Sequence, residues 1–145
     1  MFEFEATQFA TIAPMSLHPR ARIAIVGEFD PTNAAHQAIP LALAYAAEQL
    51  SGVVEHEWIA TDTLAHNAAT RLAAFNGIWC VPGGPYASFD GIVAAIHFAH
   101  ETGRPCLGAR DDDQPAAIDY GCDAQRGKLN PIVAAFVRTA QEQQA

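Results

Sequence analysis

The sequence has few cations and no long apolar run, and each shortage excludes a class of protein. Its 145 residues include eight Lys and Arg against 16 Asp and Glu, which gives a formal net charge of −8. That balance argues against nucleic-acid binding, because a protein that contacts phosphates needs a basic face. No apolar run is long enough to span a membrane, and the acidic start at residues 1–5 lacks the cations of a secretory signal. We therefore expect a cytoplasmic protein without a membrane or nucleic-acid partner.

Cysteine is scarce as well. Cys80, Cys106 and Cys122 are an odd number without a Cys-x-x-Cys spacing, so neither a disulfide framework nor a zinc site is indicated. Cys80 and Cys106 are expected on buried strands as small apolar side chains, and Cys122 in a loop as the most exposed thiol. His97 and His100 are expected on the solvent side of a helix. No metal or cofactor is predicted.

Apolar residues make up 50% of the chain and charged residues 17%, which is enough to bury the core of one domain. Residues 1–20 lack periodicity and contain two prolines, so they are interpreted as a lead-in segment, with Met15 as an alternative start. Residues 21–145 are predicted to form a single domain.

Short apolar runs alternate with helical patterns along this domain. Strands are predicted at residues 21–27, 53–60, 77–81 and 105–108. Helices are predicted at residues 33–50, 63–74, 88–102 and 131–143. Ser88 is the expected N-cap of the third helix, and Pro40 either kinks the first helix or marks its start. The alternation predicts an α/β, doubly wound sandwich with a parallel sheet covered by helices on both faces.

In such a sheet, ligands bind beyond the carboxyl ends of the strands. Glu28 and Asp30 follow the first strand and are predicted to face this crevice, with exposed loop acids as the alternative. Gly83 and Gly84 follow the third strand and present bare backbone N–H groups, suited to an oxyanion hole or simply to a tight turn. Tyr86 is a further crevice candidate.

Three segments resemble a known family in order and spacing: RIAIVGEFD at 22–30, HQAIPLAL at 36–43, and GIWCVPGGPYASFDGIVAAIHFAHETGRPCLG at 77–108. The chain resembles the class I glutamine amidotransferase domain of CTP synthase, and more closely its short stand-alone relatives. The resemblance implies a flavodoxin-like three-layer αβα sandwich that hydrolyses glutamine and passes ammonia to a synthase domain. It also implies that Gly83 and Gly84 form the oxyanion loop, that a Cys on a strand-to-helix elbow is the nucleophile, and that a later His-x-Glu activates it.

The elbow departs from the family pattern. Leu107, Gly108 and Gln114 keep its register, so Arg110 occupies the nucleophile position. Its guanidinium stays protonated and cannot accept an acyl group. Residues 111–113 are aspartates where the elbow needs small residues, and they place negative charge where an oxyanion must form. Gln114 is retained as a crevice candidate.

The base is missing too, since all six histidines precede residue 101 and no His-x-Glu follows the elbow. Residues 130–138 resemble the last helix of the family but arrive early, which implies an internal deletion between about residues 121 and 126. A shortened sheet would leave an open edge, and the last helix would expose an apolar face. Members of that face are Ile132, Val133, Phe136 and Val137. A homo-oligomer is therefore expected.

Two interpretations of function follow. The first is a CTP-synthase-like glutamine amidotransferase domain that has lost its catalytic residues. The second is a non-enzymatic module that keeps the crevice and binds glutamine, a related small ligand or a partner protein. A remnant without a selected function is a third alternative.

Overall fold

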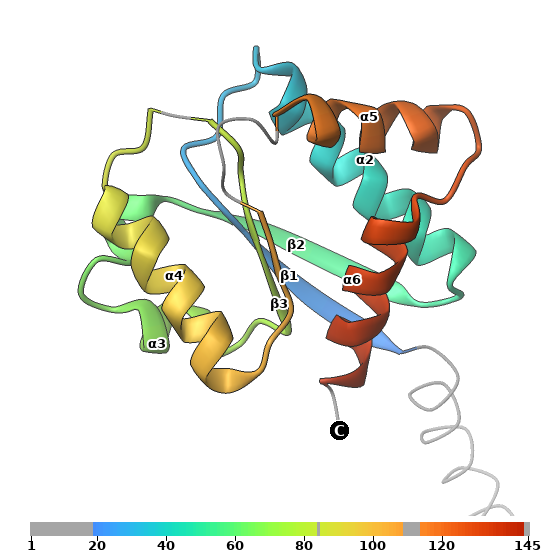
Figure 1. Cartoon of the computed structure of the whole chain (residues 1–145). Coiled ribbons are helices and arrows are strands. Elements are labelled where there is room, and N and C mark those ends of the chain that lie inside the picture. Colours follow the sequence, from blue (N-terminus) through green and yellow to red (C-terminus); the bar gives the residue numbers. More distant parts are fainter. Residues whose placement is uncertain (1–18, 84, 109–113, 144–145) are drawn as a thin grey trace, which may run out of the picture.

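A four-stranded parallel sheet forms the centre of the molecule, in a computed structural model that describes residues 19–83, 85–108 and 114–143 (Figure 1). The strands are β1 (Arg20–Val26), β2 (Val53–Ile59), β3 (Gly77–Cys80) and β4 (Cys106–Leu107), in the order β2-β1-β3-β4. The helices are α2 (Ala34–Gln49), the 3-10 helix η1 (Thr61–Thr63), α3 (Ala68–Leu72), α4 (Phe89–Thr102), α5 (Gln114–Gln125) and α6 (Pro131–Glu142). This is the predicted α/β flavodoxin-like architecture.

The two faces of the sheet carry different helices, as Figure 1 shows: α2, α5 and α6 lie on one face, and α3 and α4 on the other. β1 is apolar toward both, because successive side chains of a strand point to opposite faces. Ile23 and Ile25 enter the cluster with α2 and α6, whereas Ala24 and Val26 enter the cluster with α4. Burial on both sides explains why β1 is continuously apolar from Ile23 to Val26.

Helix α2 begins directly after its N-cap residue, Asn33. The side chain of Asn33 accepts hydrogen bonds from the backbone N–H groups of Ala35 at 2.8 Å and His36 at 3.3 Å. These bonds satisfy donors that the first helical turn leaves free. The helix then continues through Pro40, so the alternative that it starts at this proline is wrong.

Helix α6 corrects the expectation of an exposed apolar face. Val133, Phe136 and Val137 are at most 5% exposed, and only Ile132 of that face is exposed, at 52%. The helix packs over β1 and β3, where Phe136 meets Trp79 edge-on with ring centroids 5.7 Å apart. The domain therefore covers this face with its own sheet.

Two further elements differ from the sequence expectations. The stretch 63–74 was expected to be one helix but contains only the end of η1 and the five-residue α3. Helix α5 lies where no element was predicted. Its buried residues are Ala117 and Gly121, and a Cβ at Gly121 would lie 2.6 Å from the Cβ of Ala38 in α2. Small residues thus bring α5 close to α2 without a conspicuous apolar stripe.

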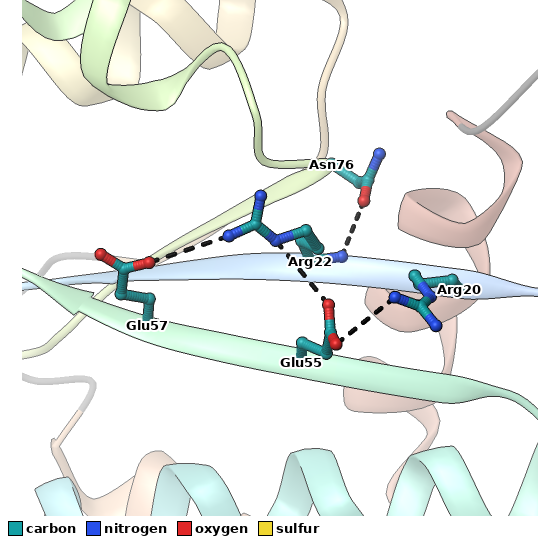
Figure 2. A network of polar contacts seen from close by, with 5 residues as sticks. All are labelled: Arg20, Arg22, Glu55, Glu57 and Asn76. Carbon is teal, nitrogen blue, oxygen red and sulfur yellow. Dashed lines mark hydrogen bonds and ion pairs between the residues drawn. The ribbon is translucent and has the colours of Figure 1, made fainter.

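Charged side chains of the neighbouring strands β1 and β2 form ion pairs on one face of the sheet (Figure 2). Arg20 and Arg22 of β1 form ion pairs with Glu55 at 3.5 and 3.8 Å, and Arg22 also reaches Glu57 at 3.8 Å. The backbone N–H of Arg22 donates to the side chain of Asn76 at 2.7 Å. Charged side chains on an edge strand discourage pairing with another sheet.

Across the described ranges, none of the helices combines the length and the hydrophobicity that a membrane crossing requires.

Candidate functional site

A cavity of about 150 Å³ lies at the carboxyl ends of β1 and β3. The chain leaves β1 toward α2 on one face and leaves β3 toward α4 on the other, so this is the switch point at which open α/β sheets bind ligands. Its lining residues are Glu28, Asp30, Asn33, His36, Val81, Gly83, Pro85 and Tyr86. We call this cavity the crevice.

Glu28 holds three loops of the crevice together. Its carboxylate accepts the backbone N–H of Thr61 at 2.7 Å, the Thr61 hydroxyl at 3.0 Å and the backbone N–H of Ala87 at 3.0 Å. The Thr61 hydroxyl oxygen in turn accepts the N–H of Ser88 at 2.9 Å. Glu28 therefore lines the crevice as predicted, with part of its hydrogen-bonding capacity used to join the loops after β1, β2 and β3.

Asp30 is fixed by its own turn. It accepts the backbone N–H of Thr32 at 2.9 Å and its hydroxyl at 2.7 Å. The hydroxyl bond and then the backbone bond hold the pKa of Asp30 below its usual value, so its charge persists to lower pH. Asp30 is exposed and lines the crevice, and its role toward a ligand stays a prediction.

His36 is a crevice residue that the sequence did not reveal. It is 6% exposed, and its Nδ1 accepts the backbone N–H of Asp30 at 2.9 Å. Burial lowers the pKa of His36, while the charges of Asp30 and Glu28 oppose that shift. The imidazole is neutral in this geometry, and since Nδ1 is an acceptor, the proton lies on Nε2.

Aromatic packing fixes the orientation of that imidazole. The His36 ring lies 5.1 Å from Trp58 and 6.3 Å from Phe29, measured between centroids, and Phe29 lies 4.9 Å from Trp58. The three side chains come from α2, β2 and the loop after β1. No short sequence motif contains them, so only the fold brings them together.

The loop after β3 approaches the start of α5. Gly83 has φ +75°, a left-handed backbone that favours glycine, and a Cβ there would lie 3.2 Å from Oε1 of Gln114. Tyr86 lines the crevice and donates its hydroxyl proton to the carbonyl of Val81 at 2.6 Å. The structure thus brings Gly83, Tyr86 and Gln114 to the same end of the sheet. Gly84 lies outside the described residues.

A smaller cavity of about 80 Å³ lies between the ends of β3 and β4 and helix α5. It is lined by Trp79, Pro82, Leu107, Gly108, Ala116, Ala117 and Tyr120. Leu107 and Gly108 lead into the expected elbow, but Arg110 and the aspartates at 111–113 lie outside the described residues. Their predicted roles therefore stay predictions.

The thiols and the remaining histidines have clear positions. Cys80 is buried as predicted, but Cys106 is exposed because β4 is a two-residue edge strand. Cys122 is half-buried inside α5 rather than in a loop, so the prediction that it is the most exposed thiol is wrong. His97 and His100 are exposed on α4, as expected. Within the described part of the chain, no three His, Cys, Asp or Glu residues are grouped to hold a metal ion.

Comparison with known proteins gives no matching family model, but it gives individual relatives. The chain is 33% identical over 109 residues to CTP synthase of Synechococcus sp. (strain JA-3-3Ab), covering 73% of this chain and 20% of that protein. It is 36% identical over 103 residues to CTP synthase of Synechococcus sp. (strain ATCC 27144 / PCC 6301 / SAUG 1402/1), covering 70% and 19%. CTP synthase of Streptococcus thermophilus (strain CNRZ 1066) is 32% identical over 108 residues, covering 73% and 20%.

The chain carries a CTP synthase-related domain. It spans about a fifth of the length of each of these CTP synthases.

Proposed function

We propose that this chain is a glutamine amidotransferase-like domain of the CTP synthase type that does not hydrolyse glutamine and binds a small amino-acid-like ligand in its crevice. The observation that carries the proposal is the approach of Gln114 to Gly83. The resemblance places these two residues at the elbow and the oxyanion loop, so the frame of the site is retained. Between Leu107 and Gln114, however, the position of the nucleophile is Arg110.

Loss of hydrolysis follows from the chemistry of the missing groups. Covalent glutamine hydrolysis needs a nucleophile and a base that activates it. Arginine supplies neither, and no histidine follows residue 100 in the sequence. His36 lines the crevice, but its Nδ1 already accepts the Asp30 N–H. Backbone oxyanion donors alone do not form or break the acyl bond.

The polar groups of the crevice favour a ligand that carries both an amine and a carboxylate or amide. Asp30 and Glu28 contribute carboxylates to the lining, and the neutral His36 lies beside them. The N-terminal end of α2, capped by Asn33, adds a partial positive charge. Among the described lining residues none is Lys or Arg, so these residues offer a dicarboxylate without an amine no full cation to pair with. A free amino acid such as glutamine fits this chemistry.

The first experiment measures ammonia release from L-glutamine by the purified chain, with a no-protein control. We expect no release above the control, and none from Arg110→Cys, because an unassisted thiol with a pKa of about 8.5 is mostly protonated at neutral pH. Turnover by the unaltered chain that disappears in Cys106→Ala would mean that the elbow is wrongly assigned. Steady turnover by Arg110→Cys would reveal a base that the proposal lacks.

The second experiment measures thermal unfolding with L-glutamine and with glutarate, which has no amine. A ligand that binds only the folded state raises the melting temperature. We expect the shift with glutamine to exceed that with glutarate, and Asp30→Asn to reduce it. Asp62→Asn, an exposed acid on η1, is the matched control. Equal shifts with both compounds, or no loss in Asp30→Asn, would refute the amino-acid ligand and favour a partner-binding module.

Two coarser properties complete the proposal. We propose a cytoplasmic location, in line with the expectation from the sequence. A homo-oligomer is also proposed, since an open sheet edge tends to pair with another chain. Light scattering across protein concentrations tests the oligomer, and a monomer at every concentration would refute it.

A further inference from the structure

Two thiols of this chain lie on neighbouring strands and on the same face of the sheet. Cys106 of β4 is in register with Ile78 of β3, and Cys80 is two residues beyond Ile78. Because side chains two apart on a strand share a face, Cys80 and Cys106 both point to the α4 side. Cys80 is fully buried in the cluster beneath α4, and Cys106 is exposed at the edge. One thiol of the pair therefore lies in the core and the other is accessible to solvent.

The two thiols shift each other's pKa in opposite directions. A hydrogen bond from Cys80 lowers the pKa of the Cys106 thiol. The same bond, together with burial, raises the pKa of Cys80 well above its ordinary value. The exposed member is thus the better thiolate, and reactivity of a cysteine follows thiolate character and access.

We propose that Cys106 and Cys80 form an oxidisable dithiol site that hydroperoxides convert to an intramolecular disulfide. The Cys106 thiolate attacks one peroxide oxygen, the O–O bond breaks, and the products are a sulfenic acid on Cys106 and an alcohol or water. The Cys80 thiol then attacks the Cys106 sulfur, the S–O bond breaks, and the departing hydroxide takes the thiol proton as water. Two thiols lose two electrons and one peroxide gains them.

The two cysteines have different roles in the proposed reaction because their solvent exposure differs. Exposure lets Cys106 meet the oxidant, whereas burial keeps Cys80 from reacting first. Closing the disulfide requires β4 to move along β3, because the two residues are offset in register. β4 is two residues long and lies at the edge of the sheet, so few backbone bonds oppose that movement. The site is independent of the crevice and of glutamine.

The test treats the full chain with hydrogen peroxide, unfolds it, alkylates free thiols and determines the mass. Reduced protein takes three alkyl groups, one for each free cysteine. Oxidised protein is expected to take one, at Cys122, and to regain all three after dithiothreitol. Peptide mapping should place the cross-link between Cys80 and Cys106, within monomers on a non-reducing gel.

Single cysteine variants separate the oxidation of Cys106 from the closure of the disulfide. Cys122→Ala is the matched control and should lose both remaining thiols as the unaltered chain does. Cys80→Ala should stop at a sulfenic acid on Cys106, trapped by dimedone, and its Cys106 should alkylate several-fold more slowly at neutral pH. Peroxide that leaves Cys80 and Cys106 free while Cys122 reacts would overturn the proposal. So would oxidation of Cys106 with Cys80 still free in the unaltered chain, a result that needs no variant to fold.

Discussion

The apolar layers and the carboxyl edge of the sheet are held by different forces. Beneath α2 and α6, Trp79 and Phe136 are at most 5% exposed and their rings meet edge-on in an apolar cluster. At the carboxyl edge, the loops are joined by hydrogen bonds that converge on Glu28, Asp30 and His36. The contacts of the apolar layers therefore do not include Glu28 or Asp30.

This separation bears on the proposal that a CTP synthase-related domain has lost its nucleophile. The contacts that β1, β3 and α6 make with one another lie within the apolar layers. In the crevice, Glu28 accepts hydrogen bonds from backbone groups of two other loops. If the proposal holds, neither set of contacts requires a catalytic nucleophile.

The largest effect is expected in the apolar layer, at Phe136. Phe136→Ala should lower the free energy of unfolding by about 3–5 kcal/mol, because it leaves a cavity against Trp79. Ile132→Ala on the same helix is the control, and since Ile132 is 52% exposed its cost should stay within about 0.5 kcal/mol. Urea unfolding measures both. Equal costs would show that α6 does not pack as described.

A smaller effect is expected at the carboxyl edge, at Glu28. Glu28→Gln replaces acceptor oxygens with an amide that cannot accept all three donors from Thr61 and Ala87, at a cost of about 1–3 kcal/mol. Glu57→Gln, which loses one exposed ion pair, is the control. Chemical denaturation compares the two variants. If Glu28→Gln costs no more than its control, the crevice loops are held by something else.

The pH dependence of stability should identify His36. Burial lowers its pKa below 6.5, so the unfolded chain binds a proton before the folded chain does as the pH falls. Its contribution is therefore present above pH 6.5 and is lost as the pH falls through the folded pKa. His36→Asn should flatten the change in urea midpoint between about pH 7.5 and about pH 5.5, whereas His97→Asn should not. A variant that keeps the full slope would assign the dependence to another group.

The smallest effect is expected on the charged strip of β1 and β2. Glu55→Gln removes ion pairs to Arg20 and Arg22 whose side chains are 40–57% exposed. Exposed pairs contribute about 0–1 kcal/mol, and salt screens them. The loss should shrink further in concentrated NaCl, measured by thermal unfolding. A loss of stability equal to that of Glu28→Gln would contradict the expected difference between exposed ion pairs and the hydrogen bonds of the crevice.

Large, regular signals made most of the fold predictable. Short apolar runs predicted β1 and β3, and the capping residue Ser88 predicted the start of α4. The helical spacing of apolar residues at 131–143 predicted α6. Helix α5 was missed because it packs through Ala117 and Gly121, which leave no apolar stripe. The exposed face of α6 was wrongly predicted, since a sequence does not show how much sheet remains to cover a helix.

The crevice was predictable only where it follows strands directly. Glu28, Asp30 and Tyr86 come from loops at strand ends, and the topology alone places those loops together. His36 lies inside a helix, and its surroundings come from Phe29 and Trp58 on separate elements. Its role depends on a backbone bond from Asp30 that no pattern of side chains encodes.

The most direct test of the central claim follows amide-¹⁵N-labelled L-glutamine by NMR in the presence of the full chain. The account predicts saturation transfer from the protein to glutamine, which reports binding, with no growth of the ¹⁵N-ammonium signal over the control. An ammonium signal that grows in proportion to protein concentration would contradict it, because a chain in which we assign Arg110 to the nucleophile position, and which has no histidine after residue 100, would then be hydrolysing glutamine.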